Sequence, residues 1–231
     1  MDQIAERTHF AVSVRDQASG ATFDHGIDRF RTASLVKVHL VALMAWRADR
    51  AGTRLTREQR RDAEEMLVRS ENDPANRVYS SLGGRDGIEE GLEAAFGRSG
   101  IHVGDELRWG RSTTTPREVV TLLDEVLDPD QAGTFSLMQD AMSRVVPEQR
   151  WGIPVVADDG TRVQTKVGWF ETPRGWVVNG SGRVVVDGSP VLISVMTDRN
   201  RTLEAGIARV EEVARLAAGI VRERRVPRLG G

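Results

Sequence analysis

The sequence of 231 residues contains no cysteine. This absence excludes disulfides, thiol catalysis and cysteine-ligated metals, and it leaves the redox compartment open. His9, His25 and His102 show no spacing typical of metal ligands, so we expect neither a metal nor another cofactor. The net charge is only −2, and nothing in that balance favours a nucleic acid or a membrane surface as a partner.

Long apolar runs are also missing. The longest, residues 38–46, is interrupted by His39 and is too short to span a membrane. The first seven residues lack the basic and apolar regions of a secretion signal. We therefore expect a protein that is cytoplasmic as the sequence stands, or exported if this is a trimmed mature form. We also expect a monomer.

Lysine is nearly absent: of 32 basic residues, only Lys37 and Lys166 are not arginine. Arginine keeps its proton in proteins, whereas a buried lysine shifts its pKa readily. We attribute the excess of arginine to coding bias. The two lysines are then candidates for positions whose function requires a side chain that can lose its proton, which arginine cannot do.

The hydrophobic pattern changes period along the chain. A strand pair is predicted near the N-terminus, then a buried helix, a helical block, and finally three strands before a long helix. The first strand is predicted at 8–16 and its partner from residue 21, the buried helix at 33–50 and the helical block at 56–144. The three later strands are predicted at 162–167, 175–186 and 191–197, and the long helix at 201–224. Residues 97–115 lack periodicity and are predicted as a long loop.

This order predicts an α/β fold with an antiparallel sheet flanked by helices and a separate helical part. We expect residues 1–50 and 150–231 to form an α/β subdomain. Residues 51–149 would be an inserted all-α subdomain. The cleft between the two is the expected place for an active site.

Ser34 and Lys37 stand at i and i+3 in the first turn of the predicted buried helix, so they share a face. A desolvated lysine amine can lose its proton and act as a base for a neighbouring serine. An ordinary capped core helix with one lysine would show the same four residues. The pair alone therefore decides nothing.

Two further motifs follow in order: residues 70–72 (Ser-Glu-Asn) between two predicted helices, and residues 166–168 (Lys-Val-Gly) on a predicted strand. The set S-x-x-K, S-D-N, K-T-G is the signature of class A β-lactamases and penicillin-binding proteins. Over nearly its whole length the sequence resembles this superfamily, and especially class A β-lactamases. The resemblance implies their two-subdomain fold and a serine hydrolase activity.

The resemblance also implies a role for each motif residue. Ser34 would be the acylated nucleophile, and Lys37 the neutral base or a partner that tunes it. Ser70 would relay the proton to the leaving nitrogen. Asn72 would hydrogen-bond the amide side chain of the substrate. Lys166 would supply positive potential for an acidic group and orient Ser70.

The remaining implied contacts lie on the third motif and the strand after it. The backbone N–H groups of Ser34 and Trp169 would form the oxyanion hole, and Gly168 would line the substrate site. Arg174 would bind a substrate carboxylate. The expected partner is thus a small, carboxylate-bearing molecule. Trp109 and Trp169 would flank the cleft.

The sequence also departs from the family pattern. Glu71 replaces the usual aspartate, and Val167 replaces a hydroxyl residue, which removes one hydrogen-bond donor. The family's Glu-x-x-x-Asn deacylation element is missing before Thr113. Glu106 is the candidate substitute base, with a solvated loop carboxylate as the alternative. An acyl-enzyme formed from a β-lactam should therefore persist.

Three functions remain open from the sequence. The first is a serine hydrolase acylated by a β-lactam or a related amide or ester. The second is an acyltransferase or specialised-metabolism hydrolase on the same fold. The third is a non-catalytic protein that binds β-lactams or peptidoglycan fragments. We favour the first.

Overall fold

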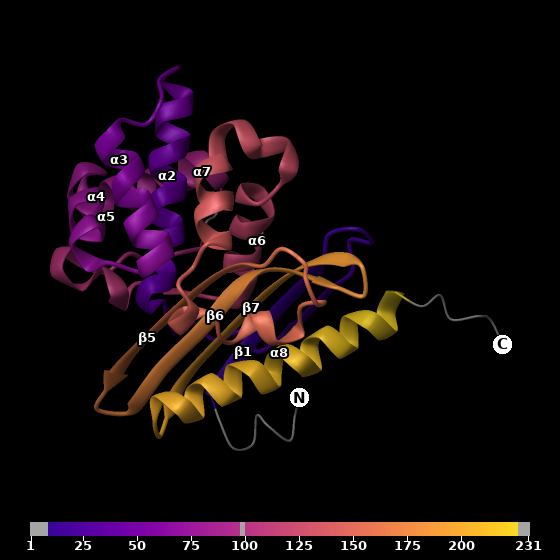
Figure 1. The fold of residues 1–231 in the computed structure, drawn as a ribbon. Coiled ribbons are helices and arrows are strands. Elements are labelled where there is room, and N and C mark those ends of the chain that lie inside the picture. Colours follow the sequence, from indigo (N-terminus) through magenta and orange to yellow (C-terminus); the bar gives the residue numbers. More distant parts are fainter. Residues whose placement is uncertain (1–8, 98–99, 226–231) are drawn as a thin grey trace.

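A five-stranded antiparallel sheet forms the centre of the molecule, as the computed structural model of residues 9–97 and 100–225 shows (Figure 1). The strand order is β2-β1-β7-β6-β5, so strands from the two ends of the chain lie side by side. The strands are β1 (His9–Asp16), β2 (Thr22–His25), β5 (Gln164–Thr172), β6 (Gly175–Val186) and β7 (Ser189–Asn200). The predicted α/β class with an antiparallel sheet flanked by helices is confirmed.

One face of the sheet is covered by the long helix α8 (Leu203–Arg225) (Figure 1). Its apolar stripe, which includes Val210 and Val213, packs on sheet residues such as Val178 and Ile193. Gly206 allows the close approach, because a Cβ there would lie 2.3 Å from a methyl group of Val178. Burying one such aliphatic side chain contributes about 1.5–3 kcal/mol.

The opposite side of the molecule is helical. Helix α2 (Val36–Arg50) follows the short 3-10 turn η1 (Ala33–Leu35) and is buried on every side from Val36 to Ala45. It packs against α4, α5 and α7, which explains a sequence with no polar stripe. The other helices here are α3 (Arg57–Glu64), η2 (Glu65–Arg69), α4 (Asn72–Ser81), α5 (Gly84–Phe96), α6 (Pro116–Val126), η4 (Pro129–Gln131), α7 (Ala132–Ser143) and η5 (Pro147–Gln149). The short turn η6 (Ile153–Val156) instead packs against α8 and β6.

The division at residues 50 and 150 stays a prediction. Helix α6 belongs by sequence to the predicted helical insert, yet it packs on β1 and β7. None of the helices in residues 9–97 and 100–225 combines the length and apolarity that crossing a bilayer would need.

Capping sequences set the start of two helices where the sequence predicts them. Thr56 and Gln59 form a reciprocal capping box at α3, and Thr115 and Glu118 form another at α6, with Pro116 in the first turn. Each box satisfies backbone N–H groups that lack partners within the helix. Helix α4 begins at Asn72 with Glu71 as its N-cap and without a side-chain capping bond.

The predicted loop at 97–115 is partly wrong. It contains η3 (Glu106–Arg111) and the strand β4 (Thr113–Thr114), which pairs with β3 (Phe30–Arg31). These elements are too short to show a period of their own. Strand β4 forms because it pairs with a segment about eighty residues away in the chain. The neighbouring turn η3 is closed by local hydrogen bonds and places Trp109 beside η1.

Candidate active site

Ser34 lies in the tight turn η1 that leads into α2. The preceding residue, Ala33, has φ of +49°, a left-handed conformation that a residue with a Cβ rarely adopts. Strand β5 presses on this turn: a Cβ at Gly168 would lie 2.7 Å from the Ser34 nitrogen and 2.9 Å from the Thr32 oxygen. The glycine of the third motif therefore lets the strand backbone contact the serine backbone.

Asn179 on β6 holds the same turn from the sheet. Its amide nitrogen donates to the carbonyl oxygens of Arg31 at 2.8 Å and Thr32 at 3.2 Å, and its oxygen accepts from the Thr197 N–H at 3.2 Å. The side chain is fully buried. These bonds fix the strained backbone before Ser34, and strain persists only where surrounding structure holds it.

The hydroxyl of Ser70 lies between the two lysines of the chain. Lys166 Nζ is 2.9 Å from Ser70 Oγ, and Lys37 Nζ is 3.3 Å from it. Lys37 also donates to the Ser70 carbonyl and, at 2.9 Å, to Asn72 Oδ1. Ser70 itself has φ of +63° at the end of η2. The three sequence motifs thus meet in space.

Both lysines are buried, and burial changes their protonation. It lowers the pKa of Lys37 to about 7, with the Glu71 carboxylate acting in the opposite direction. Burial also lowers the pKa of Lys166 well below its ordinary value, and the charge of Lys37 adds to that effect. Lys37 lies 5.0 Å from the centre of the Trp109 ring. A neutral amine near pH 7 can accept a proton.

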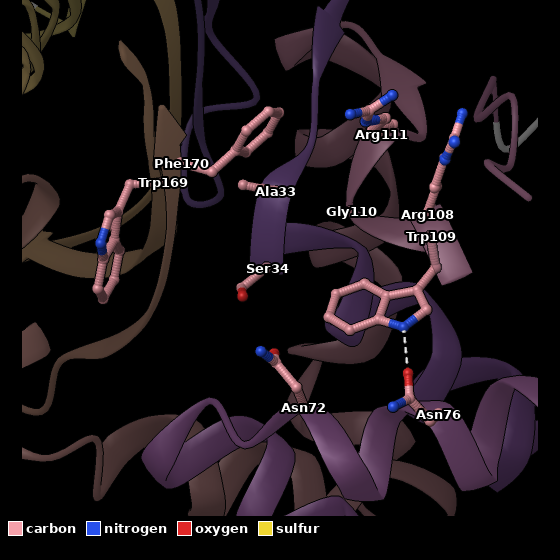
Figure 2. A pocket seen from close by; sticks show the side chains of 10 residues that line it. All are labelled: Ala33, Ser34, Asn72, Asn76, Arg108, Trp109, Gly110, Arg111, Trp169 and Phe170. Carbon is pink, nitrogen blue, oxygen red and sulfur yellow. Dashed lines mark hydrogen bonds between the residues drawn. The ribbon is translucent and has the colours of Figure 1, made fainter. Parts of the chain in front are cut away.

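A pocket of about 530 Å³ opens in front of Ser34. Trp169 and Trp109 lie on opposite sides of it, and the Ser34 hydroxyl points toward Asn72 (Figure 2). Trp109 is fixed by its ring N–H, which donates to Asn76 Oδ1 at 2.7 Å. The lining residues are Ala33, Ser34, Asn72, Asn76, Arg108, Trp109, Gly110, Arg111, Trp169 and Phe170. This volume suits a small molecule.

One predicted site residue does not join this group. Arg174 lies in the β5–β6 turn and lines a neighbouring pocket instead. Glu106 begins η3, but its side chain lies outside what the structure describes. None of the described residues lining the Ser34 pocket carries a carboxylate. The described residues also contain no group of three histidine, aspartate or glutamate side chains placed to hold a metal ion.

Sequence reasoning missed several residues that shape the site. Asn179 could have been singled out because it lies within a predicted strand, where asparagine is rare, and a buried asparagine needs hydrogen-bond partners. Arg108 and Arg111 line the pocket, and the guanidinium group of Arg108 points away from Ser34 (Figure 2). Asn76 and Phe170 carried no signal in the sequence.

The chain matches the model of the "Beta-lactamase enzyme family" over residues 60–221. This match includes Ser70 and Lys166 and begins after Ser34. No curated protein matches the chain in sequence.

Solved structures share the fold at low identity. An ancestral class A β-lactamase is 21% identical with a TM-score of 0.81, and the alignment covers 95% of this chain and 98% of that one. A β-lactamase from Chitinophaga pinensis is 17% identical with a TM-score of 0.83, covering 95% and 97%. One from Burkholderia vietnamiensis is 20% identical with a TM-score of 0.82, covering 98% and 96%. The chain therefore belongs to the β-lactamase enzyme family and has the class A β-lactamase fold.

Proposed function

We propose that this protein is a serine hydrolase that forms an acyl-enzyme on Ser34 with a β-lactam or a related amide or ester. The observation that carries the proposal is the Ser70 hydroxyl between two buried lysines, beside the pocket into which Ser34 opens. This arrangement offers a nucleophile, a neutral base and a proton relay together. Membership of the β-lactamase family agrees with such chemistry.

Acylation would proceed in two steps. The neutral amine of Lys37 takes the proton of the Ser34 hydroxyl as its oxygen attacks the substrate carbonyl carbon. The oxyanion then accepts hydrogen bonds from the N–H groups of Ser34 and Trp169. When the carbon–nitrogen bond breaks, the leaving nitrogen takes the proton of the Ser70 hydroxyl. Ser70 regains a proton from the Lys37 ammonium, to which it is already hydrogen-bonded.

Substrate binding would use groups that the lysines leave free. Asn72 accepts from Lys37 through its oxygen, so its NH₂ group is available to the substrate's amide side chain. Lys166 adds positive potential for a substrate carboxylate. The Val167 side chain is fully buried and apolar and offers that carboxylate no hydrogen bond. We therefore expect weaker selection for a carboxylate than a hydroxyl at this position would give.

Release of the acyl group is the slow step in this proposal. A deacylating water needs a base, and the described pocket lining contains no carboxylate. Glu106 remains the candidate. The same observation supports a second function, an acyltransferase in which an amine or alcohol replaces water as acceptor. In that case a specialised-metabolism ester or amide would be the substrate.

Intact-protein mass spectrometry after mixing with a penicillin tests the proposal. We expect a stoichiometric adduct that forms on the wild type, decays slowly and is missing in Ser34→Ala. Loss of the adduct on adding a small amine, but not in buffer, would favour the acyltransferase. Absence of any adduct on the wild type with several β-lactams and activated esters would overturn the proposal. So would an adduct that survives Ser34→Ala.

Glu106→Gln separates the candidate base from a solvated carboxylate. If Glu106 activates the water, adduct decay should slow by tenfold or more while adduct formation is unchanged. Glu58→Gln is a matched control, because Glu58 lies in the first turn of α3 and outside the pocket. Equal decay rates in all three proteins would remove Glu106 from the mechanism.

A further inference from the structure

A second cavity, of about 500 Å³, lies next to the Ser34 pocket and is lined by four arginines and one carboxylate. The arginines are Arg29, Arg31, Arg174 and Arg199, and the carboxylate is Asp198. We propose that this cavity is a binding site for a small molecule that carries two or more carboxylate or phosphate groups. The proposal does not depend on acylation at Ser34.

The arginines are not equally available to a ligand. Arg29 contacts the Glu118 carboxylate at 3.3 Å and donates to the Thr113 carbonyl at 2.8 Å, so it is held by the protein. Arg31 and Arg174 have no ion-pair partner within the described residues. Two cations at this cavity are thus left without a neutralising protein group.

The single carboxylate does not neutralise them. Asp198 lies 2.6 Å from His9 Nδ1 and 3.6 Å from Arg199 Nε. Its closer partner is therefore the histidine, and Arg199 is held at the outer limit of an ion pair. Among the residues that line the cavity, Asp198 is the one carboxylate beside Arg31, Arg174 and Arg199, and it already has a hydrogen bond. The local charge is positive although the whole chain carries −2.

Backbone geometry brings two of these arginines together. The β5–β6 turn and the end of β7 lie at the same end of the sheet (Figure 1). At Gly175, φ is +111°, and a Cβ would lie 2.6 Å from the Asn200 oxygen, so the turn is pressed on the backbone after Arg199. Arg199 itself has φ of +58°. Arg174 and Arg199 thus extend from two backbones in close contact.

Arg31 is positioned from a third direction. It pairs with Thr113 in the β3–β4 ribbon, and its carbonyl accepts the bond from Asn179. The backbone under each of the three arginines is therefore fixed, while their side chains are exposed. A fixed backbone lowers the entropy that the site loses when a ligand binds.

The shape and charge of the cavity define the ligand class. Guanidinium groups bind carboxylate and phosphate oxygens through paired, charge-assisted hydrogen bonds. Three of them around a concave space of this size suit a compact molecule with several anionic groups. A polymer would need a positive surface that continues beyond the cavity, and the net charge of the chain gives no sign of one.

The cavity is a neighbour of the Ser34 pocket and not a part of it. Arg31 and Thr172 line the cavity, whereas Ala33 and Phe170 line the pocket. In each of these two segments, a single residue lies between the lining of the cavity and the lining of the pocket: Thr32 in the first and Glu171 in the second. Because of this separation, the ligand can be tested with Ser34 removed.

Isothermal titration calorimetry of the Ser34→Ala protein with pyrophosphate and, separately, with citrate tests the site. We expect saturable binding of one molecule per chain at low salt by at least one of them, weakening as salt is added. Tighter binding of pyrophosphate would indicate a phosphate ligand, and tighter binding of citrate would indicate a carboxylate ligand. Acetate at matched ionic strength is the single-charge comparison and should bind at least tenfold more weakly.

Arg31→Gln and Arg174→Gln should each weaken the binding about tenfold, since each removes one charge-assisted pair. Arg174→Lys should recover only part of the loss, because lysine lacks the paired donors. Arg54→Gln removes the same charge from the α2–α3 connection and should change nothing. No saturable binding by either probe would overturn the proposal. Equal weakening in the Arg54→Gln control would also overturn it, because the binding would then be non-specific.

Discussion

Burial of Lys37 should make the protein more stable at alkaline pH. Its pKa is about 7 in the folded chain and 10.5 in the unfolded chain. Between these values the unfolded chain binds a proton that the folded chain does not, so the free energy of unfolding rises with pH. At about 1.36 kcal/mol for each pKa unit, the full effect is about 5 kcal/mol.

The part that falls within a convenient range is about 3 kcal/mol, between pH 6.5 and pH 9.5. The lowered pKa of Lys166 acts in the same direction. Urea denaturation of the wild type at several pH values measures the slope. Lys37→Met removes the titrating group, and its curve should be flatter by about 3 kcal/mol over that range, whatever the variant does to stability at any single pH.

Comparing the slopes of unfolding free energy against pH separates the titration of Lys37 from other effects of the substitution on stability. Lys37→Met also leaves the Asn72 oxygen without a donor, which should lower stability equally at every pH. Lys37→Arg keeps a cation that does not titrate in this range, and it should flatten the curve as well. Parallel curves for the wild type and both variants would refute the reasoning, because Lys37 would then be charged in the folded protein.

Four further predictions concern the candidate site. The rate of acylation should rise about tenfold between pH 6 and pH 8, as Lys37 loses its proton; a rate independent of pH in stopped-flow assays would exclude it as the base. Asn179→Ala removes three hydrogen bonds from the backbone of Arg31, Thr32 and Thr197 and should lower the free energy of unfolding in urea by about 3 kcal/mol. Asn76→Ala, which loses one bond near the surface, should cost about 1 kcal/mol. Gly168→Ala places a Cβ 2.7 Å from the Ser34 nitrogen and should slow adduct formation about 100-fold, whereas a normal rate would show that the turn can move.

Local signals in the sequence predicted much of the fold. The capping residues Thr56 and Thr115, the strand pattern from residue 162 onward and the apolar pattern of α2 each depend on a few neighbouring residues. Such signals remain visible whatever the rest of the chain does. The three short motifs were readable for the same reason, and in the structure Lys37 and Lys166 each lie within hydrogen-bonding distance of Ser70.

Features that depend on distant pairing could not be predicted. Strands β3 and β4 contain two residues each and pair with each other across more than eighty residues of chain. The side of the β5–β6 turn on which Arg174 lies depends on how that turn packs against β7, and no residue in the turn encodes it. Motif spacing therefore identified Ser34 and its partners, but it could not separate the two neighbouring pockets.

The bonds from Asn179 join residues 148 and 147 positions apart in the chain. Contacts of such long range form late, because a large loop must close before they contribute. A chain with formed helices and an undocked β6 would possess Ser34 but lack the fixed turn that aims it. Covalent labelling of Ser34 would therefore mark completely folded molecules, and a fluorescent acylating compound could count them during refolding.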